Sequence, residues 1–296
     1  MVRMIPAKTI LQKSRYEPSE WFGIDYVMNL YRGCTHGCIY CDSRSNCYGI
    51  KDFTEVQVKE GTDVLLAKSL HAKKSSGIIS TGIIADCYNP YEEEFGVTRR
   101  ALEIIADCRF GADVNTKSPL VTRDIDVLER VAWARSANVR FTITAADDDL
   151  ARTIEPHAPS SSERFAAMKE ISDSGLFTGV MLTPLVPFVT DTAENIESLV
   201  ELAHDNGARF IYTLGGVSIR DGQKEYFMSK LKAMSPKLAK RFRDTYGSSY
   251  FCYSLELNNI LALLRERCDK AGILYRMDDI IHASQNHTEQ EQTSLF

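Results

Sequence analysis

The sequence has no long apolar run near its N-terminus and only a small excess of charge. Because a long apolar run is missing there, we expect neither a signal peptide nor a membrane span. We therefore expect a cytoplasmic protein without a membrane partner. The net charge of −5 gives no sign of a strongly basic surface, although a local basic groove is compatible with an acidic total. Without a secretion signal, the eight cysteines indicate thiolate chemistry in a reducing cytosol better than disulfides.

Three of these cysteines, Cys34, Cys38 and Cys41, form a C-x3-C-x2-C motif, and Tyr40 precedes the last of them. Three thiolates can hold three irons of a [4Fe-4S] cluster and leave the fourth iron without a protein ligand. An iron with an open position can bind a substrate or a cofactor. The motif therefore predicts a cluster that takes part in chemistry, beyond storing electrons.

Two other uses of the motif stay open at this point. A structural zinc site usually takes four ligands in paired spacings, and no later C-x2-C pair follows, but Cys47 or His36 could supply a fourth ligand. A ferredoxin-type cluster would need a fourth cysteine in a more compact run. Cys108 and Cys268 lie on helical patterns and are explained as small buried apolar residues.

Strand-like and helix-like runs alternate through the middle of the chain, which predicts a parallel sheet with crossover helices. The strand-like runs are Val27–Tyr31, Gly77–Ala85, Ala112–Thr116, Val139–Ala145, Thr178–Thr183 and Arg209–Leu214, and the helical patterns are Thr62–His71, Thr98–Asp107, Asp124–Ala134, Ser162–Asp173 and Thr192–Asp205.

Six strands are too few for a closed eight-stranded barrel, so we expect an α/β fold with a partial, TIM-like (β/α)6 barrel. The expected domain spans residues 1–283, with its core at about 24–215 and packed C-terminal helices at about 223–272. The cysteine motif follows the first strand, and ligand sites in such folds lie at the carboxyl ends of strands. Residues 284–296 are polar and lack apolar periodicity, so we expect a flexible tail.

The motifs together resemble a known family. The C-x3-C-x2-C motif with its aromatic residue is similar to the signature of the radical S-adenosylmethionine (SAM) superfamily. The longer string over residues 28–42, MNLYRGCTHGCIYCD, resembles the spore photoproduct lyase-like branch, also called DNA repair photolyase-related proteins. The similarity continues at 86–92, 116–124, 154–159 with Arg164, and 184–188.

The resemblance implies a fold and a chemistry. Cys34, Cys38 and Cys41 would ligate the [4Fe-4S] cluster, and its fourth iron would chelate the amino and carboxylate groups of SAM. An electron from a flavodoxin- or ferredoxin-type donor would lead to cleavage of SAM and to a 5′-deoxyadenosyl radical, which abstracts a hydrogen atom from the substrate. The cofactors do the difficult chemistry, while the protein positions them and excludes water.

The resemblance also implies residues that contact SAM. Tyr40 would lie near the adenine, although it could simply pack the cluster loop. Asp86 follows the second strand and would contact the SAM amino group, or it could form a turn or a helix N-cap. Lys117 and Thr142, on the third and fourth strands, would also contact SAM, and a lysine suits a carboxylate.

Two further residues have less specific roles. Arg164 could hold the SAM carboxylate, or it could form a salt bridge with Glu155. Cys87 could donate a hydrogen atom to a substrate radical from its place beside the SAM pocket, or it could be a semi-buried thiol. In spore photoproduct lyase the donor cysteine aligns nearer Ile83, so this chain need not repair the same lesion.

The last five residues, QTSLF, resemble the bacterial sliding-clamp-binding motif. Leu295 and Phe296 would fill an apolar pocket of the clamp, and Gln292 would hydrogen-bond at its rim. Such a tail would bring an acidic enzyme to DNA through a partner.

The resulting hypothesis is a radical SAM enzyme, lyase-like, that repairs a damaged DNA base. One alternative is a radical SAM enzyme acting on RNA, a peptide or a small molecule. Another is a clamp-associated iron–sulfur protein whose cluster is not catalytic.

Overall fold

The computed structural model describes the backbone of residues 2–294 and the side chains of residues 2–287. Its main feature is a seven-stranded sheet, in which only the edge strand β2 runs antiparallel to its neighbour. The strand order is β10 (Phe210–Tyr212), β9 (Phe177–Met181), β8 (Ala137–Thr142), β7 (Gly111–Thr116), β6 (Ile78–Thr81), β3 (Tyr26–Met28) and β2 (Leu11–Lys13).

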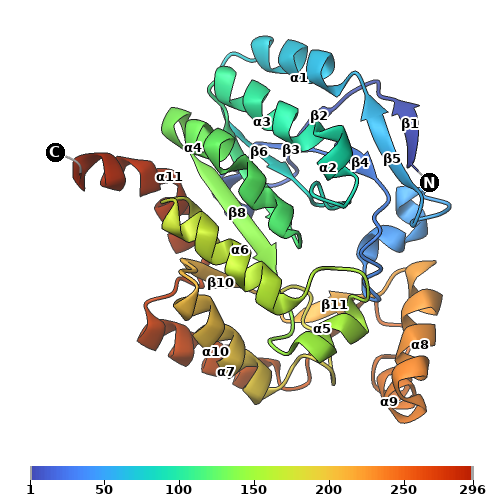
Figure 1. Ribbon diagram of the computed structural model, residues 1–296. Helices are drawn as coiled ribbons and strands as arrows, with labels where there is room; N and C mark the ends of the chain where they lie inside the picture. Colours follow the sequence, from blue (N-terminus) through green and yellow to red (C-terminus); the bar gives the residue numbers. More distant parts are fainter. Residues whose placement is uncertain (1, 295–296) are drawn as a thin grey trace.

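Crossover helices cover one face of this sheet and follow one another along its outer side in Figure 1. The six parallel strands and their helices confirm the expected partial barrel, which stays open because β10 and β2 are its two ends. The helices are α1 (Thr62–His71), α3 (Val97–Asp107), α4 (Ile125–Ala134), α6 (Ser161–Asp173) and α7 (Ala193–Asp205).

Strand β8 alternates between an apolar outer face and a polar inner face. On β8, Val139 and Phe141 belong to the main hydrophobic core, whereas Asn138 and Arg140 are buried polar residues on the opposite face. The polar face points into the barrel, where a functional site can be built. The start of helix α6 is set by its own sequence, since Ser160 and Glu163 form a capping box there.

Several short elements were not expected from the sequence. The unexpected strands pair with distant segments of the chain and form two small sheets apart from the main sheet. They are a small sheet of β1 (Val2–Pro6), β5 (Val56–Glu60) and β4 (Tyr31–Arg32), the hairpin-like pair β11 (Gly216–Ser218) and β12 (Phe251–Tyr253), and helices α2 (Glu92–Phe95) and α5 (Asp148–Ile154).

Three helices occupy the region 223–272, in which packed C-terminal helices were expected. Helices α8 (Gln223–Met234) and α9 (Pro236–Tyr246) pack on each other, and α10 (Leu257–Ala271) packs on α7. In Figure 1, α8 and α9 stand apart from the helical layer, beside the open side of the barrel. The expected domain boundaries stay a prediction.

The prediction that a flexible tail begins at Ser284 is wrong at the start of that segment. Residues 284–294 continue helix α11 (Met277–Ser294). Ser284 is buried and its carbonyl accepts a hydrogen bond from Ser136 Oγ at 2.8 Å, while the His287 ring packs edge-on against Phe177. Polar residues thus anchor the helix through specific contacts, which an apolar pattern does not reveal. Leu295 and Phe296 lie outside the described residues.

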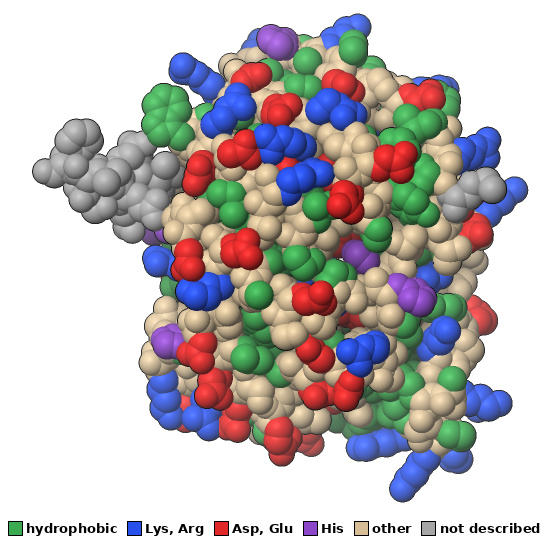
Figure 2. Space-filling model, in the orientation of Figure 1, with side chains coloured by type: hydrophobic (Ala, Val, Ile, Leu, Met, Phe, Trp, Pro, Cys, Tyr) green, Lys and Arg blue, Asp and Glu red, His purple; other side chains and the backbone are tan. Residues whose placement is uncertain are grey.

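The surface carries charges of both signs. Figure 2 shows acidic and basic side chains interspersed on the face in view, without a broad area of one sign. Between residues 2 and 294, no helix has the length and apolar character needed to cross a membrane. All eight cysteines are free thiols.

Candidate active site

A cavity of about 280 Å³ opens at the carboxyl edge of the parallel strands. All three cysteines of the motif line it, together with residues from the ends of β6, β7, β8 and β9. This is the edge at which α/β folds bind ligands. The sequence therefore brings its cysteine motif and its strand-end residues to one place.

The cysteines lie on a loop between β4 and a 3-10 turn, Asp42–Arg44. Backbone hydrogen bonds fix the loop: Cys34 N donates to Phe53 O, and the amide of the residue after Cys38 donates to Ile154 O, both at 2.9 Å. Cys34 and Cys38 are buried, and burial is the main reason that the pKa of Cys34 rises to about 12. Since iron binds thiolates, loading a metal cluster here must release protons.

Burial also raises the pKa values of Cys38 and Cys41 above the ordinary value of a thiol. Burial therefore favours the protonated form of all three thiols until a metal replaces their protons.

The donor set fits a three-cysteine cluster better than zinc. Among residues 2–287, no three His, Cys, Asp or Glu side chains stand where they could share a single metal ion. In a [4Fe-4S] cluster each thiolate binds its own iron, so the ligands stand further apart. Of the two candidates for a fourth ligand, Cys47 is exposed and outside the cavity. His36 lines the cavity, its Nε2 contacts Asp86 and its buried Nδ1 has no hydrogen-bond partner in the described part of the chain, so His36 keeps one nitrogen that could bind a metal.

Asp86 lies at the centre of the site and joins three segments. Its Oδ1 accepts hydrogen bonds from Thr116 Oγ1 at 2.7 Å and Tyr88 N at 2.9 Å. Its Oδ2 accepts one from Lys117 N at 2.8 Å. The same oxygen lies 2.9 Å from Nε2 of His36, which belongs to the loop that carries the three cysteines, called the cluster loop below. Burial opposes the charge, but the His36 contact and the other donors hold the pKa of Asp86 below its usual range. A carboxylate has about four acceptor positions, and all are used here.

The expected contact of Asp86 with SAM therefore stays a prediction, and the alternative role in a turn stands beside it. Its acceptor positions are already filled by the chain, and its Tyr88 contact is the turn that was the alternative. Asp86 acts in this structure as a positioning residue for the cluster loop.

Lys117 and Thr142 both line the cavity, as the resemblance implied. The ammonium of Lys117 lies 5.8 Å from the centre of the Tyr40 ring. Burial opposes its charge, yet Cys38, when it is a thiolate, and the Glu155 carboxylate raise the pKa of Lys117 above its usual value. A lysine that stays charged at the cavity wall suits an anionic group such as a carboxylate.

Tyr40 also lines the cavity, but its hydroxyl donates to Glu155, which forms a buried ion pair with Arg164. Arg164 donates further hydrogen bonds to the carbonyls of Pro159 and Thr142. Arg164 is 1% exposed and does not line the cavity. The expected contact between Arg164 and SAM is therefore not supported, and the alternative salt bridge is present.

The hydrogen-donor role expected for Cys87 does not fit the structure. Cys87 is 1% exposed, belongs to the main hydrophobic core and does not line the cavity. Burial is the largest of the effects that raise its pKa. Consecutive side chains in this segment point in different directions, so Asp86 reaches the cavity while Cys87 enters the core. Ile83, in contrast, lines the cavity and is 45% exposed.

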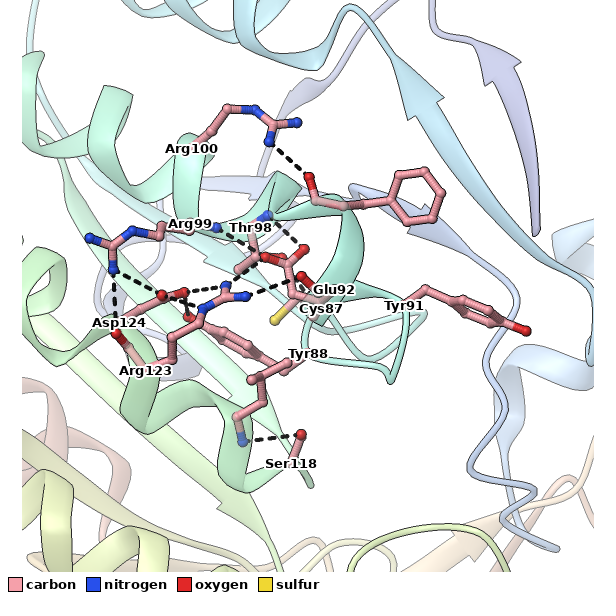
Figure 3. A network of polar contacts seen from close by, with 12 residues as sticks. Cys87, Tyr88, Tyr91, Glu92, Thr98, Arg99, Arg100, Ser118, Arg123 and Asp124 are labelled. Carbon is pink, nitrogen blue, oxygen red and sulfur yellow. Dashed lines mark hydrogen bonds and ion pairs between the residues drawn. The ribbon is translucent and has the colours of Figure 1, made fainter. Parts of the chain in front are cut away.

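A polar network behind the cavity explains the motifs at residues 86–92 and 116–124 (Figure 3). Glu92 is fully buried and accepts hydrogen bonds from Tyr31 Oη at 2.5 Å and from Arg123 Nη2 at 2.9 Å. Arg123 also pairs with Asp124, which accepts a hydrogen bond from Tyr88 Oη at 3.0 Å. The network therefore ties the strand before the cluster loop to the loops after β6 and β7.

Trp21 and Arg140 are among the cavity-wall residues that the sequence did not predict. Trp21 comes from a 3-10 turn, Trp21–Gly23, that precedes the first parallel strand, and Arg140 comes from the middle of β8. Alternation along β8 could have placed Arg140 on the inner face with Thr142. Nothing in the sequence pattern indicates that Trp21 returns to the cavity.

Known proteins are similar to this chain in sequence. An uncharacterized protein of Methanocaldococcus jannaschii is 34% identical over 186 residues, which cover 62% of this chain and 68% of the relative. An uncharacterized protein of Mycobacterium tuberculosis is 27% identical over 229 residues, covering 75% of this chain and 67% of the relative.

Solved structures share the fold. Spore photoproduct lyase complexed with dinucleoside spore photoproduct superposes with a TM-score of 0.70 at 16% identity, covering 93% of this chain and 81% of that chain. TsrM of Kitasatospora setae, a radical SAM methyltransferase with tryptophan substrate bound, gives a TM-score of 0.56 at 10% identity, with coverages of 91% and 62%. The Radical SAM superfamily model matches residues 28–203, which hold the cysteine motif and most of the cavity's strands. The chain belongs to the radical SAM superfamily.

Proposed function

We propose that this protein holds a [4Fe-4S] cluster and SAM in its cavity and abstracts a hydrogen atom from a damaged DNA base, as a lyase-like repair enzyme. The observation that carries the proposal is the convergence of Cys34, Cys38 and Cys41 with Lys117 and Thr142 on one cavity at the carboxyl edge of the sheet. When bound, the reduced cluster and SAM supply the radical chemistry.

The chain's own residues bind, orient and enclose these groups. The three cysteines provide the iron ligands, and Lys117 provides a positive charge for a carboxylate. Asp86 holds the cluster loop against the loop after β7 through the contacts of His36 and Lys117 N. The walls around these groups limit the access of water.

The DNA substrate rests on weaker support than the cofactors. The fold is shared with spore photoproduct lyase, which has been solved with a dinucleoside lesion. Ile83 lies in the cavity where the resemblance would place a donor thiol, and Cys87 lies in the core. Another group would then quench the substrate radical, so this chain need not repair the same lesion as the relative.

The first experiment tests the cofactors. Protein reconstituted with iron and sulfide without oxygen, then given SAM and dithionite, is expected to release 5′-deoxyadenosine. A variant with Cys34, Cys38 and Cys41 all changed to Ala is expected to lose the cluster absorbance, whereas Cys47→Ala is the matched control and keeps it. An intact cluster that never cleaves SAM would instead favour an iron–sulfur protein with a non-catalytic cluster.

The second experiment tests the substrate. Labelled SAM is used, and its cleavage and the transfer of its label to DNA are compared for irradiated DNA, undamaged DNA and no DNA. Product that forms only with irradiated DNA is the expected result. Cleavage of SAM that no DNA stimulates would point to RNA, a peptide or a small molecule as the substrate class.

We also propose two partners. A flavodoxin- or ferredoxin-type protein supplies the electron, and the terminal QTSLF peptide binds the bacterial sliding clamp through Gln292, Leu295 and Phe296. A labelled peptide of the last residues is expected to bind purified clamp in a polarisation titration, and a peptide with Leu295 and Phe296 changed to Ala is its control. Equal signals for the two peptides would remove the clamp from the proposal.

A further inference from the structure

Helices α8 and α9 carry an excess of positive charge that the rest of the chain does not share. Residues 223–246 contain seven Lys and Arg residues and two acidic residues, a net charge of +5, so the remaining residues together carry −10. Figure 2 shows Lys and Arg side chains gathered at the lower right of the face in view, where Figure 1 places these two helices. A local excess of this kind in an acidic protein is suited to a polyanionic partner.

Most of these cations have no carboxylate partner. Within residues 2–287, the salt bridges include one cation of α8 and α9, Lys240, which pairs with Asp244. The neighbouring helix α10 differs, because its Lys270 pairs with Glu266. Exposed cations without such a partner keep their charge available to a ligand, and on α8 and α9 they are Lys230, Lys232, Lys237, Arg241 and Arg243.

The packing of α9 turns several of these cations toward solvent. Phe242 is buried in a hydrophobic cluster, whereas Lys237, Lys240 and Arg241 are exposed. Spacings of three and four residues put these three cations on one side of the helix. Lys232 lies in the last turn of α8, just before the start of α9. These four residues are called the basic face below.

The two helices are attached to the cavity by the strands at their ends. Strand β11 precedes α8, β12 follows α9, and the two strands pair with each other. Val217 and Phe251 of these strands line the cavity. The first turn of α8 also contacts the cluster loop, since Gln223 Nε2 donates to Tyr40 O at 3.0 Å. The basic face therefore belongs to an element that is fixed beside the cavity.

Exposed aromatic rings accompany the cations on this side of the cavity. Tyr250 and Tyr253 lie on either side of Phe251 in the sequence and are 54% and 52% exposed. The Arg220 guanidinium lies 5.0 Å from the centre of the Tyr250 ring. Proteins that bind single-stranded nucleic acid combine cations for the phosphates with aromatic rings on which bases stack. The combination favours a nucleic acid over an acidic protein as the partner.

We propose that the basic face of α8 and α9 binds the phosphate backbone of the DNA strand whose damaged base enters the cavity. Contacts to phosphates fix the position and orientation of a strand without reading its sequence. The inference rests on the proposed function and adds to it the surface that holds the backbone of the substrate. It also gives a chain with a net charge of −5 a direct contact with a polyanion.

Neutralising charges on the basic face of the cluster-loaded protein tests the inference without turnover. The probe is fluorescein-labelled, undamaged oligothymidylate, and its anisotropy is measured without oxygen at several KCl concentrations. A variant with Lys232, Lys237 and Lys240 all changed to Gln is expected to bind about 10-fold more weakly than wild type. The dependence of log affinity on log salt should lose about 0.7 for each lysine that contacts a phosphate.

The matched control changes Lys68, Lys169 and Lys270 to Gln. These exposed lysines lie on α1, α6 and α10 and do not line the cavity. Both variants have the same net charge, so they differ only in where the charge is removed. The control is expected to bind the probe as wild type does, and circular dichroism and cluster absorbance establish that each variant is folded.

The outcomes separate the inference from the proposed function. Equal affinity and salt dependence of the basic-face variant and wild type would overturn the inference, while product from irradiated DNA would leave the proposed function standing. Equal weakening in both variants would also overturn it, because binding would then follow the overall charge. Unchanged DNA affinity with slower reduction of the cluster by a flavodoxin would assign the basic face to the electron donor instead. Lysine-dependent binding without product from irradiated DNA would support the basic face and remove the repair reaction alone.

Discussion

Asp86 shows how one buried side chain can join separate segments of a site. Its two oxygens join the cluster loop, through His36, to the end of β7, through Thr116 and the Lys117 amide. A neutral side chain of the same shape keeps part of these contacts but not the charge. The effect of removing the charge should therefore depend on pH.

We expect Asp86→Asn to lower the free energy of unfolding by about 1.5–3 kcal/mol at pH 7, the range for hydrogen bonds to a charged group. The pKa of Asp86 is lower in the folded protein than in the unfolded chain. Its contribution is therefore present above the unfolded pKa of about 3.9 and is lost as the pH falls toward the folded pKa. Urea unfolding of both proteins from pH 7 down to about pH 3 measures this. A difference that stays constant over this range would contradict the assignment.

The sequence predicts the three cysteines of the cavity as iron ligands, but it does not predict the whole cavity wall. The cysteines stand within eight residues, so their spacing alone brings them together. Trp21 and Arg140 reach the same cavity from a turn before the sheet and from the middle of a strand. Their meeting depends on how the barrel curves, which no local pattern records. The core position of Cys87 could not be predicted either, because the direction of side chains in a loop follows no fixed period.

At the scale of elements, the network in Figure 3 holds three segments that carry the site. Glu92 is its main acceptor, because it receives the Tyr31 hydroxyl, the Arg123 guanidinium and the Thr98 amide, the last at 2.9 Å. Tyr31 precedes Cys34 by three residues. Removing the carboxylate would leave several buried donors without a partner and would loosen the start of the cluster loop.

We expect Glu92→Ala to cost about 3 kcal/mol in the free energy of unfolding, since the buried Tyr31 hydroxyl and Thr98 amide each lose their acceptor, at about 1–3 kcal/mol per group. The iron content after reconstitution should fall as well. Glu93→Ala is the matched control, because Glu93 is the exposed neighbour on the same helix. Chemical unfolding and iron analysis check both variants. If Glu92→Ala bound a full cluster with normal stability, the network would have no role in holding the site.

The elements that the sequence predicted well are those with a local signal. The pattern at Thr62–His71 gave the bounds of α1 as observed, because amphipathic spacing is a property of the helix itself. The strand expected at Gly77–Ala85 is shorter, Ile78–Thr81, since its apolar continuation forms cavity wall instead of sheet. The small sheet of β1, β5 and β4 was missed because its pairing joins segments about fifty residues apart.

At the scale of the whole molecule, the last helix closes a hydrophobic cluster begun by the first segments. Phe22, Ile24 and Ile78 pack with Phe177 and Phe210 of the sheet. Ile280 of α11 completes this cluster and is fully buried, and Met277 packs against it. The helix thereby supports the turn that presents Trp21 to the cavity. Helix α11 and the Trp21–Gly23 turn are therefore linked through this cluster.

Deletion of residues 277–296 should therefore affect both stability and the cavity. Loss of one buried isoleucine typically costs about 2–5 kcal/mol, so loss of the helix is expected to lower the free energy of unfolding by at least 3 kcal/mol or so. In a Trp133→Phe background, Trp21 is the remaining tryptophan. Its fluorescence should shift to longer wavelength as its turn becomes solvated.

The control is a shorter deletion, of residues 292–296, which removes the clamp-like peptide but keeps every packing contact named for residues 277–287. We expect its urea midpoint and the emission of Trp21 to match those of the full chain. If the two deletions behaved alike, α11 would not support the Trp21 turn. If the longer deletion lowered stability but left the emission unchanged, the helix would support the core alone. An effect on both is expected because the same helix packs on the cluster and accepts the Phe22 amide at Met277.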